Sequence, residues 1–200
     1  MKMDFTRKAR WLLDGHKTAG PKISTYAGVV SRESVRIALT YAALNVSDVT
    51  TADIRNAYLQ EPSSQCEYIV CGPDSGLENA GKKCLIRRAL YWDKNSGRDF
   101  WNYLRSCMHH IGFESCKAYT YVWMRAANKE DGTKYWEYAM LYTDDVLVVS
   151  ERGEQFLRNE LGKYFELKEE SIGPPRIYLG GKMSKVVLEN DLTASYFSSS

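Results

Sequence analysis

Two adjacent carboxylates interrupt an apolar segment in the second half of the chain. Asp144 and Asp145 stand near the middle of residues 138–149, and β-branched or aromatic residues flank them on both sides. This pattern predicts a β-hairpin that carries both acids at its tip. Two carboxylates in a buried hairpin repel each other and lose hydration, and a divalent metal ion would compensate for both effects. A solvated Asp-Asp turn is the alternative interpretation, because Asp is a common turn residue.

A third acid lies far upstream in a segment of similar character. Asp53 belongs to residues 48–59, which are predicted to begin as a strand and to end in a turn before Pro62. The aromatic residue Tyr58 follows Asp53 five positions later. The sequence therefore contains an Asp at a strand end as well as the Asp-Asp hairpin.

These two features together resemble a known family. An Asp at a strand end followed by an aromatic residue is similar to motif A of reverse transcriptases, and Tyr-X-Asp-Asp at 142–145 is similar to motif C. The resemblance runs from about residue 7 to about residue 187 and is to the polymerase domain of a copia-type retrotransposon polyprotein. It implies an RNA-directed DNA polymerase that transfers a nucleotide from a dNTP to a primer 3′-hydroxyl.

The resemblance also implies a metal centre and a set of partners. Asp53, Asp144 and Asp145 would be the catalytic residues and the ligands of two Mg²⁺ ions, for which Mn²⁺ can substitute. Asp53 and Asp144 would bridge both ions, and Asp145 would be more peripheral. The implied partners are an RNA or DNA template with its primer, a dNTP, and the remainder of a polyprotein, with integrase upstream and ribonuclease H downstream.

Four residues are implied to contact the nucleotide. Lys8 and Arg10 match basic residues of the family's fingers, whose cations contact the triphosphate or the template. Tyr58 occupies the position of the steric gate, an aromatic ring that leaves no room for a ribose 2′-hydroxyl. Asn95 stands where the family has a nucleotide-facing Gln.

Two further motifs lie near the C-terminal end of the resemblance. Tyr178, Leu179 and Gly180 are similar to the primer grip, which would place the primer 3′ end. Lys168 follows Phe165-Glu166-Leu167, which is similar to the family's F-x-M-K segment, and it is the candidate general acid that protonates pyrophosphate.

The fold class that we expect is α+β, a polymerase palm with an antiparallel sheet backed by helices, plus partial fingers and no thumb. The fingers are expected at residues 1–30 and 62–92, and the palm at 31–61 and 93–187. Residues 188–200 are expected to be a ragged C-terminal end.

Apolar periodicity predicts three helices. Ser31 is the expected N-cap of a helix over 32–44, and Gly112 is the expected stop of a helix over 98–111. The third helix is expected over 151–165. Strands are predicted over 67–71 and 116–124, and residues 84–91 are predicted to be a strand or the start of a helix.

Composition is that of an ordinary globular chain, with 44% hydrophobic and 26% charged residues among 200. Residues 1–40 hold eight Lys and Arg against three acids, whereas residues 130–170 hold eleven acids against five bases. Such asymmetry suits a nucleic-acid enzyme, and an unevenly charged solvated surface explains it equally well.

The five cysteines include no C-x-x-C pair, which favours reduced thiols. Because no apolar run approaches about 20 residues, we expect a soluble chain with no membrane partner. Reduced thiols favour an intracellular location, and the expected compartments are the cytoplasm, a virus-like particle or the nucleus.

Two other functions fit parts of the sequence. Trp92 replaces a Gly of the family pattern and Asp93 replaces a Leu, which favours a decayed or co-opted retroelement fragment that keeps the fold, lacks catalysis and at most binds nucleic acid. The retained aspartates argue against that alternative. An unrelated carboxylate-metal hydrolase is the third hypothesis, and the order and spacing of the motifs fit it less well.

Overall fold

The computed structural model describes residues 29–63, 68–73, 78–187 and 193–199. The chain divides into two compact units. Unit 1 comprises Met1–Ala27 and Tyr58–Tyr103, and unit 2 comprises Gly28–Ala57 and Leu104–Ser200. The secondary structure is a mixture of helices and antiparallel sheets, as the α+β prediction required.

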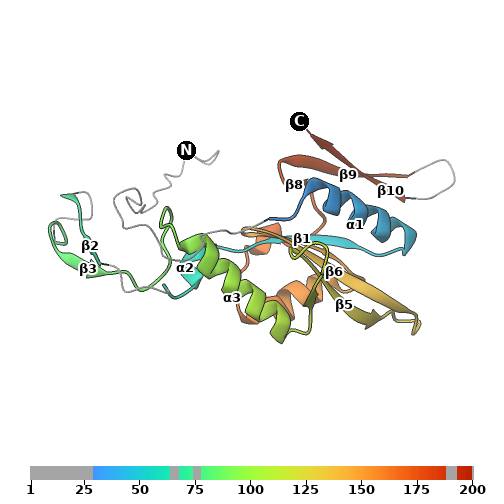
Figure 1. Ribbon diagram of the computed structural model, residues 1–200. Helices are drawn as coiled ribbons and strands as arrows, with labels where there is room; N and C mark the ends of the chain where they lie inside the picture. The colour runs from blue at the N-terminus through green and yellow to red at the C-terminus, as the bar shows by residue number, and fades with distance from the viewer. Residues whose placement is uncertain (1–28, 64–67, 74–77, 188–192, 200) are drawn as a thin grey trace. The chain divides into compact units, whose positions relative to one another are not determined.

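Unit 2 is built on a five-stranded sheet with the order β1-β7-β6-β5-β4, in which every neighbouring pair is antiparallel (Figure 1). Its hairpin of β6 and β7 is the one predicted from the apolar run around the two acids. The last part of the middle strand β6 and most of its neighbour β7 are buried, and the residues next to their common turn are half-buried. The strand bounds are β1 (Val49–Asp53), β4 (Glu114–Ser115), β5 (Val122–Asn128), β6 (Lys134–Tyr142) and β7 (Asp145–Val149).

Helix α1 (Arg32–Leu44) covers one face of this sheet. The Ser31 side chain accepts a hydrogen bond from the Ser34 N–H at 3.1 Å, so the predicted N-cap is confirmed. One side of the helix is buried in a core shared with β1, β6 and β7, namely Val35, Ala38, Leu39 and Ala42. Helical spacing of these small and branched residues explains why the predicted bounds are correct.

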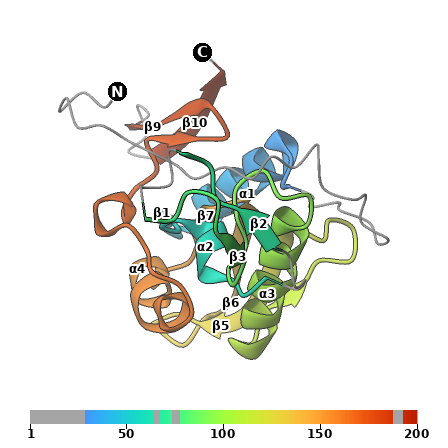
Figure 2. The same cartoon turned by 90° about the vertical axis from the view of Figure 1, so that its left-hand side faces the viewer.

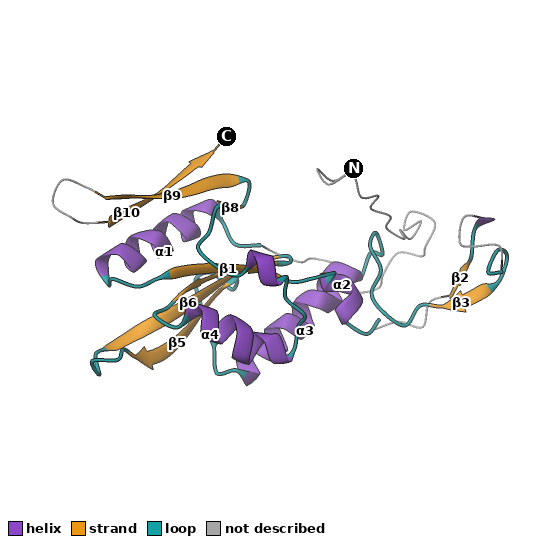
Figure 3. Cartoon of the chain, turned by 180° about the vertical axis from the view of Figure 1, so that it is seen from behind, coloured by secondary structure: helices purple, strands orange, loops and turns teal. Residues whose placement is uncertain are grey.

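A three-stranded sheet with the order β10-β9-β8 lies on the other side of α1 (Figures 1 and 3). Its strands are β8 (Ile177–Tyr178), β9 (Gly181–Val187) and β10 (Thr193–Ser199). Tyr178 and Met183 join the core around α1. Residues 193–199 thus form a regular strand where the sequence suggested a ragged end, because β9 offers them a complete ladder from Val187 back to Gly181.

Helical segments pack against the face of the five-stranded sheet that α1 does not cover. Helix α3 (Ser96–His110) ends before Gly112, whose φ of +93° confirms the predicted stop. His109 of this helix lies edge-on to Trp123 of β5 at 4.9 Å between ring centroids. The segment that contains α4 (Gly153–Gln155) lies beside β5 and β6 (Figure 2).

The prediction of one regular helix over 151–165 is wrong. After α4 the chain forms a π-helical turn, η3 (Phe156–Glu160), and a 3₁₀ turn, η4 (Leu161–Lys163). The Leu161 N–H reaches the carbonyl of Phe156 as well as that of Leu157, which is the wide hydrogen bond of a π turn. The apolar face is nevertheless as predicted, because Phe156, Leu157, Leu161 and Phe165 are all buried.

Arg125 on β5 explains this irregular turn. Its guanidinium donates to the carboxylates of Glu137 at 2.9 Å and Glu160 at 2.6 Å, and it stacks 4.5 Å from the centre of the Phe113 ring. Buried charges are tolerated only when they are paired and hydrogen-bonded. The wide turn keeps Glu160 on this cation while Phe156 remains in the core.

Two other segments differ from the prediction. The strand expected over 116–124 begins only at Val122, because the carbonyl of Tyr119 accepts from the Val122 N–H at 3.0 Å and closes a turn. Residues after Asp53 form the short helix α2 (Ala57–Gln60) as well as a turn.

In unit 1, β2 (Tyr68–Val70) pairs with β3 (Lys83–Leu85) in an antiparallel hairpin. None of the helices in the described ranges has the length and apolar character of a membrane span.

Candidate active site

Asp53 and Asp145 are directly opposed across the ladder of β1 and β7. Residues opposed in an antiparallel ladder point to the same face of the sheet. The Asp53 backbone makes its hydrogen bonds on the outer edge of β1, away from β7. Its N–H donates to Ser171 Oγ at 2.8 Å, and its carbonyl accepts from the Lys168 N–H at 2.9 Å. Asp53 and Asp145 therefore form a non-hydrogen-bonded pair, the kind in which Cα atoms approach to about 4.5 Å and side chains are closest.

Asp144 lies in the two-residue turn between β6 and β7, after Thr143. Its carbonyl accepts a hydrogen bond from the Ile54 N–H at 2.8 Å, which ties the turn to the end of β1. Thr143 has a φ of +52°, a conformation that costs a β-branched residue about 1–3 kcal/mol. The three aspartates are thus brought to one end of the sheet by backbone pairing, with Asp145 on the strand and Asp144 at the tip.

The outer edge of β1 is covered by the irregular segment 166–173, which we call the β1 clamp. At one end of the clamp the Glu166 carbonyl accepts a hydrogen bond from the Arg55 N–H at 2.8 Å. At the other end the Gly173 carbonyl accepts one from the Thr51 N–H at 2.8 Å. Between these ends the clamp contains a 3₁₀ turn, η5 (Glu169–Ser171). Beside Asp53 the clamp pairs with β1 through the Lys168 N–H and the Ser171 side chain rather than as a regular strand.

Lys168 forms an ion pair with Asp53. Its Nζ donates to Oδ2 of the Asp53 carboxylate, and the Asp53 side chain is 26% exposed. The Lys168 N–H also donates to the Asp53 carbonyl at 2.9 Å. The candidate general acid and a candidate metal ligand are therefore in direct contact, 115 residues apart in sequence.

Electrostatics at this strand end are dominated by like charge. Burial, together with the neighbouring charges of Asp144 and Asp53, raises the pKa of Asp145 to about 6, and Lys168 opposes the shift. The negative charges of Asp144 and Asp53 therefore disfavour the charged form of Asp145. A cation at this position would relieve the repulsion.

Across the described ranges, no three His, Cys, Asp or Glu side chains are grouped so as to hold a metal ion by themselves. The chemistry of the donors nevertheless suits Mg²⁺, which takes one or two carboxylates and completes its shell with water and substrate phosphates. Asp53 Oδ1 is buried and accepts no hydrogen bond from any described residue. A buried carboxylate oxygen without a donor is a position that a cation would satisfy.

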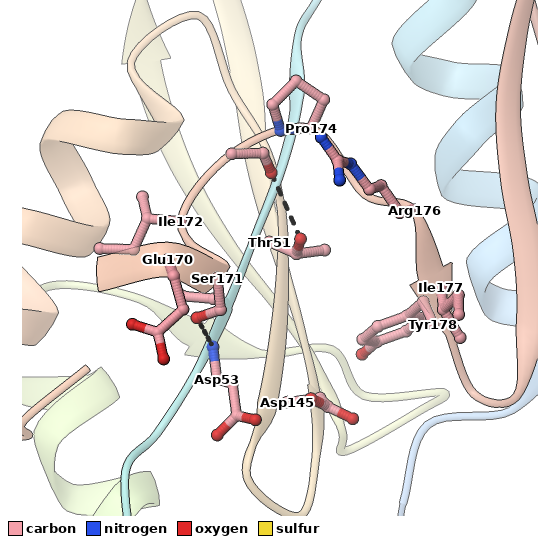
Figure 4. Close-up of a pocket in the computed structure, with 12 residues that line it drawn as sticks. Thr51, Asp53, Asp145, Glu170, Ser171, Ile172, Pro174, Arg176, Ile177 and Tyr178 are labelled. Carbon is pink, nitrogen blue, oxygen red and sulfur yellow. Dashed lines mark hydrogen bonds between the residues drawn. The ribbon is translucent and has the colours of Figure 1, made fainter. Parts of the chain in front are cut away.

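A pocket of about 390 Å³ opens beside these residues (Figure 4). Asp53 and Asp145 line it from adjacent strands, Glu170 lines it from η5, and Arg176 lines it from the segment just before β8. Tyr178 completes the wall on the side of β8. The pocket therefore offers acidic oxygens, a guanidinium and an aromatic side chain to one ligand.

Tyr178, Leu179 and Gly180 form the tight hairpin between β8 and β9. Leu179 and Gly180 both have positive φ values, +50° and +69°, as a two-residue type I′ turn requires. The buried Tyr178 hydroxyl donates to the Met140 carbonyl at 3.1 Å, and burial raises its pKa well above the usual value. The hairpin is thereby attached to β6 two residues before Tyr142.

The other predicted nucleotide contacts lie in unit 1 or outside the described residues. Tyr58 packs edge-on against Tyr91 and Phe100, with ring centroids 5.2 and 5.8 Å away. Asn95 is buried, and its Oδ1 accepts no hydrogen bond within the described part of the chain. Lys8 and Arg10 fall in the residues that the structure does not describe.

Sequence reasoning missed Ser171, Glu170 and Arg176. No local signal singles them out, since Glu170 and Ser171 lie in a polar stretch before Gly173 and two prolines, and Arg176 follows those prolines. Their relation to Asp53 arises from pairing between segments 118 residues apart, as in the bond from the Asp53 N–H to Ser171 Oγ.

Comparison with known proteins gives two matches. A family model described as "Reverse transcriptase (RNA-dependent DNA polymerase)" matches residues 2–198. The chain is also similar to the "Retrovirus-related Pol polyprotein from transposon RE1" of Arabidopsis thaliana, with 26% identity over 125 residues, which is 62% of this chain. The matched region spans 8% of the length of that relative.

Proposed function

The chain belongs to the reverse transcriptase (RNA-dependent DNA polymerase) family, and on that premise we propose that it is the RNA-directed DNA polymerase domain of a copia-type retrotransposon polyprotein. The family assignment predicted from the sequence is confirmed. The observation that carries the proposed activity is the opposition of Asp53 and Asp145 on one face of the sheet, with Asp144 in the adjoining turn. We assign unit 2 to the palm and the described part of unit 1 to the fingers.

Asp53, Asp144 and Asp145 would hold two Mg²⁺ ions, or Mn²⁺ in their place. The buried Oδ1 of Asp53 supports this assignment, as does the Asp145 pKa, which burial and the charges of Asp144 and Asp53 together raise to about 6. When bound, such ions lower the pKa of an attacking hydroxyl and neutralise charge on a leaving pyrophosphate. The residues' own contribution is to keep carboxylate oxygens fixed on a buried strand end, where little reorganisation is needed.

Lys168 would donate a proton to the leaving pyrophosphate. Its ammonium already lies on the Asp53 carboxylate, which keeps it close to the reacting groups. The backbone bond from Lys168 N–H to the Asp53 carbonyl restricts the same residue to this edge of β1.

The hairpin at Tyr178, Leu179 and Gly180 would act as the primer grip. Its support is the bond from the Tyr178 hydroxyl to the Met140 carbonyl, which couples the hairpin to the strand that leads into the Asp-Asp turn. The adjoining pocket, with Arg176 on its wall, is polar enough to receive the end of a nucleic-acid strand. Tyr58 would exclude the ribose 2′-hydroxyl, and Lys8, Arg10 and Asn95 would contact the incoming dNTP.

The deciding experiment is incorporation of labelled dNTP on a primed RNA template with Mg²⁺, with Asp144→Asn as the inactive control. We expect extension of the primer by the wild-type chain and a loss of at least about 100-fold in the variant, because metal ligands contribute several kcal/mol to such reactions. A primed DNA template in parallel measures template preference. Extension by the wild-type chain no greater than that by Asp144→Asn would refute the proposal.

A further inference from the structure

One hydroxyl contacts the backbones of both partners in the Asp53–Lys168 ion pair. Ser171 Oγ accepts a hydrogen bond from the Asp53 N–H at 2.8 Å (Figure 4) and donates one to the Lys168 carbonyl at 2.6 Å. Each bond lies within the normal range for its type. Ser171 therefore links the strand that carries the acid to the loop that carries the cation.

The 3₁₀ turn in the β1 clamp makes this side chain, and not a backbone carbonyl, the acceptor for the Asp53 N–H. On either side of it the clamp pairs with β1 through backbone bridges, Ile54 with Leu167 and Thr51 with Gly173. At Asp53 the clamp's backbone provides a donor, the Lys168 N–H, whereas the acceptor for the Asp53 N–H is the side-chain oxygen of Ser171 at the end of the 3₁₀ turn. A partly buried N–H without an acceptor is unfavourable, and local rearrangement would follow its loss.

The position of the Asp53 carboxylate depends on that bond. The backbone of Asp53 is held on its outer side by Ser171 and Lys168, while Asp145 repels its carboxylate from the opposite strand. Functional carboxylates must be held to within about 0.5 Å, and supporting groups of metal ligands change affinity or activity by about 10–100-fold.

We propose that Ser171 is a positioning residue of the polymerase site. Its hydroxyl holds Asp53 and Lys168 in one arrangement, so that Asp53 presents its free Oδ1 to a divalent metal ion while Lys168 stays within reach of Oδ2. This inference rests on the proposed polymerase function. The chemistry that it predicts is a requirement for a hydroxyl at this position and not for a particular side-chain volume.

Ser171→Thr and Ser171→Val form a matched pair for the test, because Thr and Val have nearly the same shape and only Thr retains the hydroxyl. Mn²⁺ binding to the free full chain, followed by electron paramagnetic resonance, gives a readout that is independent of catalysis. Steady-state incorporation on a primed RNA template gives kcat and the KM for primer–template separately. Thermal unfolding and circular dichroism report whether each variant folds.

We expect Ser171→Val to bind Mn²⁺ about tenfold more weakly than the wild-type chain and to lose about tenfold in kcat with its KM for primer–template almost unchanged. Ser171→Thr is expected to stay within about twofold of wild type in both measurements. Ser171→Ala, which adds no volume, is expected to resemble Ser171→Val and serves as the second hydroxyl-free variant if Val disturbs folding.

Two results overturn the inference. One is wild-type Mn²⁺ affinity and kcat in a folded hydroxyl-free variant. The other is a loss in Ser171→Thr as large as that in Ser171→Val at equal thermal stability. The failure of the proposed function is distinguishable, because then the wild-type chain itself neither binds Mn²⁺ nor extends a primer.

Discussion

Asp53 lies directly opposite Asp145 in the ladder of β1 and β7, and the outward-facing backbone bonds of Asp53 make this a close, non-hydrogen-bonded pair. Two acids at such a position are unfavourable to the fold without a cation, since each raises the free energy of the other's charged form. Stability and function therefore make opposite demands on the same residues, which is a common property of active sites.

Asp145→Asn is accordingly expected to stabilise the metal-free protein while abolishing catalysis. Removing one charge relieves the repulsion that helps to raise the Asp145 pKa to about 6. After allowance for solvent screening at this half-buried site, we expect the free energy of unfolding at about pH 8 to rise by about 1 kcal/mol. Urea unfolding measures this change, and primer extension measures the loss of activity.

Asp131→Asn is the control, because Asp131 is an exposed turn residue whose carboxylate accepts from the Thr133 N–H at 2.8 Å. Its removal should lower stability slightly and leave primer extension intact. A less stable Asp145→Asn protein would contradict the expected repulsion.

Lys168→Arg separates the charge of Lys168 from its ability to release a proton. Arginine keeps a cation beside Asp53, so thermal stability should stay close to wild type, but a guanidinium does not act as an acid near neutral pH. We expect the single-turnover rate of incorporation to fall by about 100-fold. Lys168→Met should lose both rate and stability. Full activity in Lys168→Arg would exclude Lys168 as the proton donor.

Tyr178→Phe tests the attachment of the β8–β9 hairpin to β6. The buried Met140 carbonyl loses its hydroxyl donor, which should lower the free energy of unfolding by about 1–3 kcal/mol. If the hairpin is the primer grip, the KM for primer–template should rise as well. Tyr41→Phe is the matched control, because its hydroxyl also bonds to the backbone of β6, at Trp136, but this bond is exposed to solvent. An unchanged KM in Tyr178→Phe would argue against the primer-grip role.

Trp92→Gly should stabilise the chain although it deletes a large apolar side chain. Trp92 has a φ of +71°, and its side chain is 73% exposed, so little packing is lost. The left-handed conformation costs an L-residue about 1–2 kcal/mol, and glycine avoids this cost. Because glycine loses more conformational entropy on folding, the net rise in the free energy of unfolding should be about 0.5–1 kcal/mol. Thermal unfolding measures it. Trp92→Ala keeps the Cβ atom and should show no such gain.

Glu61→Gln should remove a pH dependence of stability in unit 1. Burial, with repulsion from Asp99, raises the pKa of Glu61 from 4.5 to about 7, and Arg88 opposes the shift. The folded protein then binds this proton more tightly than the unfolded chain, so the free energy of unfolding falls as pH rises from about 4.5 to about 7.

At about pH 8 the Gln variant should be more stable than wild type by about 1–2 kcal/mol after allowance for solvent screening, and at about pH 4 the two should be equal. Urea titrations at both pH values measure this. Glu114→Gln, at an exposed position, is the control. A wild-type chain whose stability does not fall over this range would contradict the shifted pKa.

Much of the local structure followed from the sequence. The Ser31 cap, the apolar row of α1, the hairpin around Asp144 and Asp145, and the stop at Gly112 were all predictable. Their causes lie within a few residues, in helical or strand periodicity and in backbone preferences. The reverse transcriptase assignment followed from the resemblance of the motifs around Asp53 and around residues 142–145 to those of the family.

The arrangement around Asp53 required the tertiary structure. The β1 clamp, the contact with Lys168 and the bond to Ser171 join segments 115–118 residues apart, and no periodic pattern encodes such pairing. The π turn at 156–160 depended in the same way on Arg125, which lies on a distant strand. The sequence determined which residues are candidates for the chemistry, whereas long-range backbone pairing decided which of them meet, because those contacts form only when the sheet and its edge have assembled.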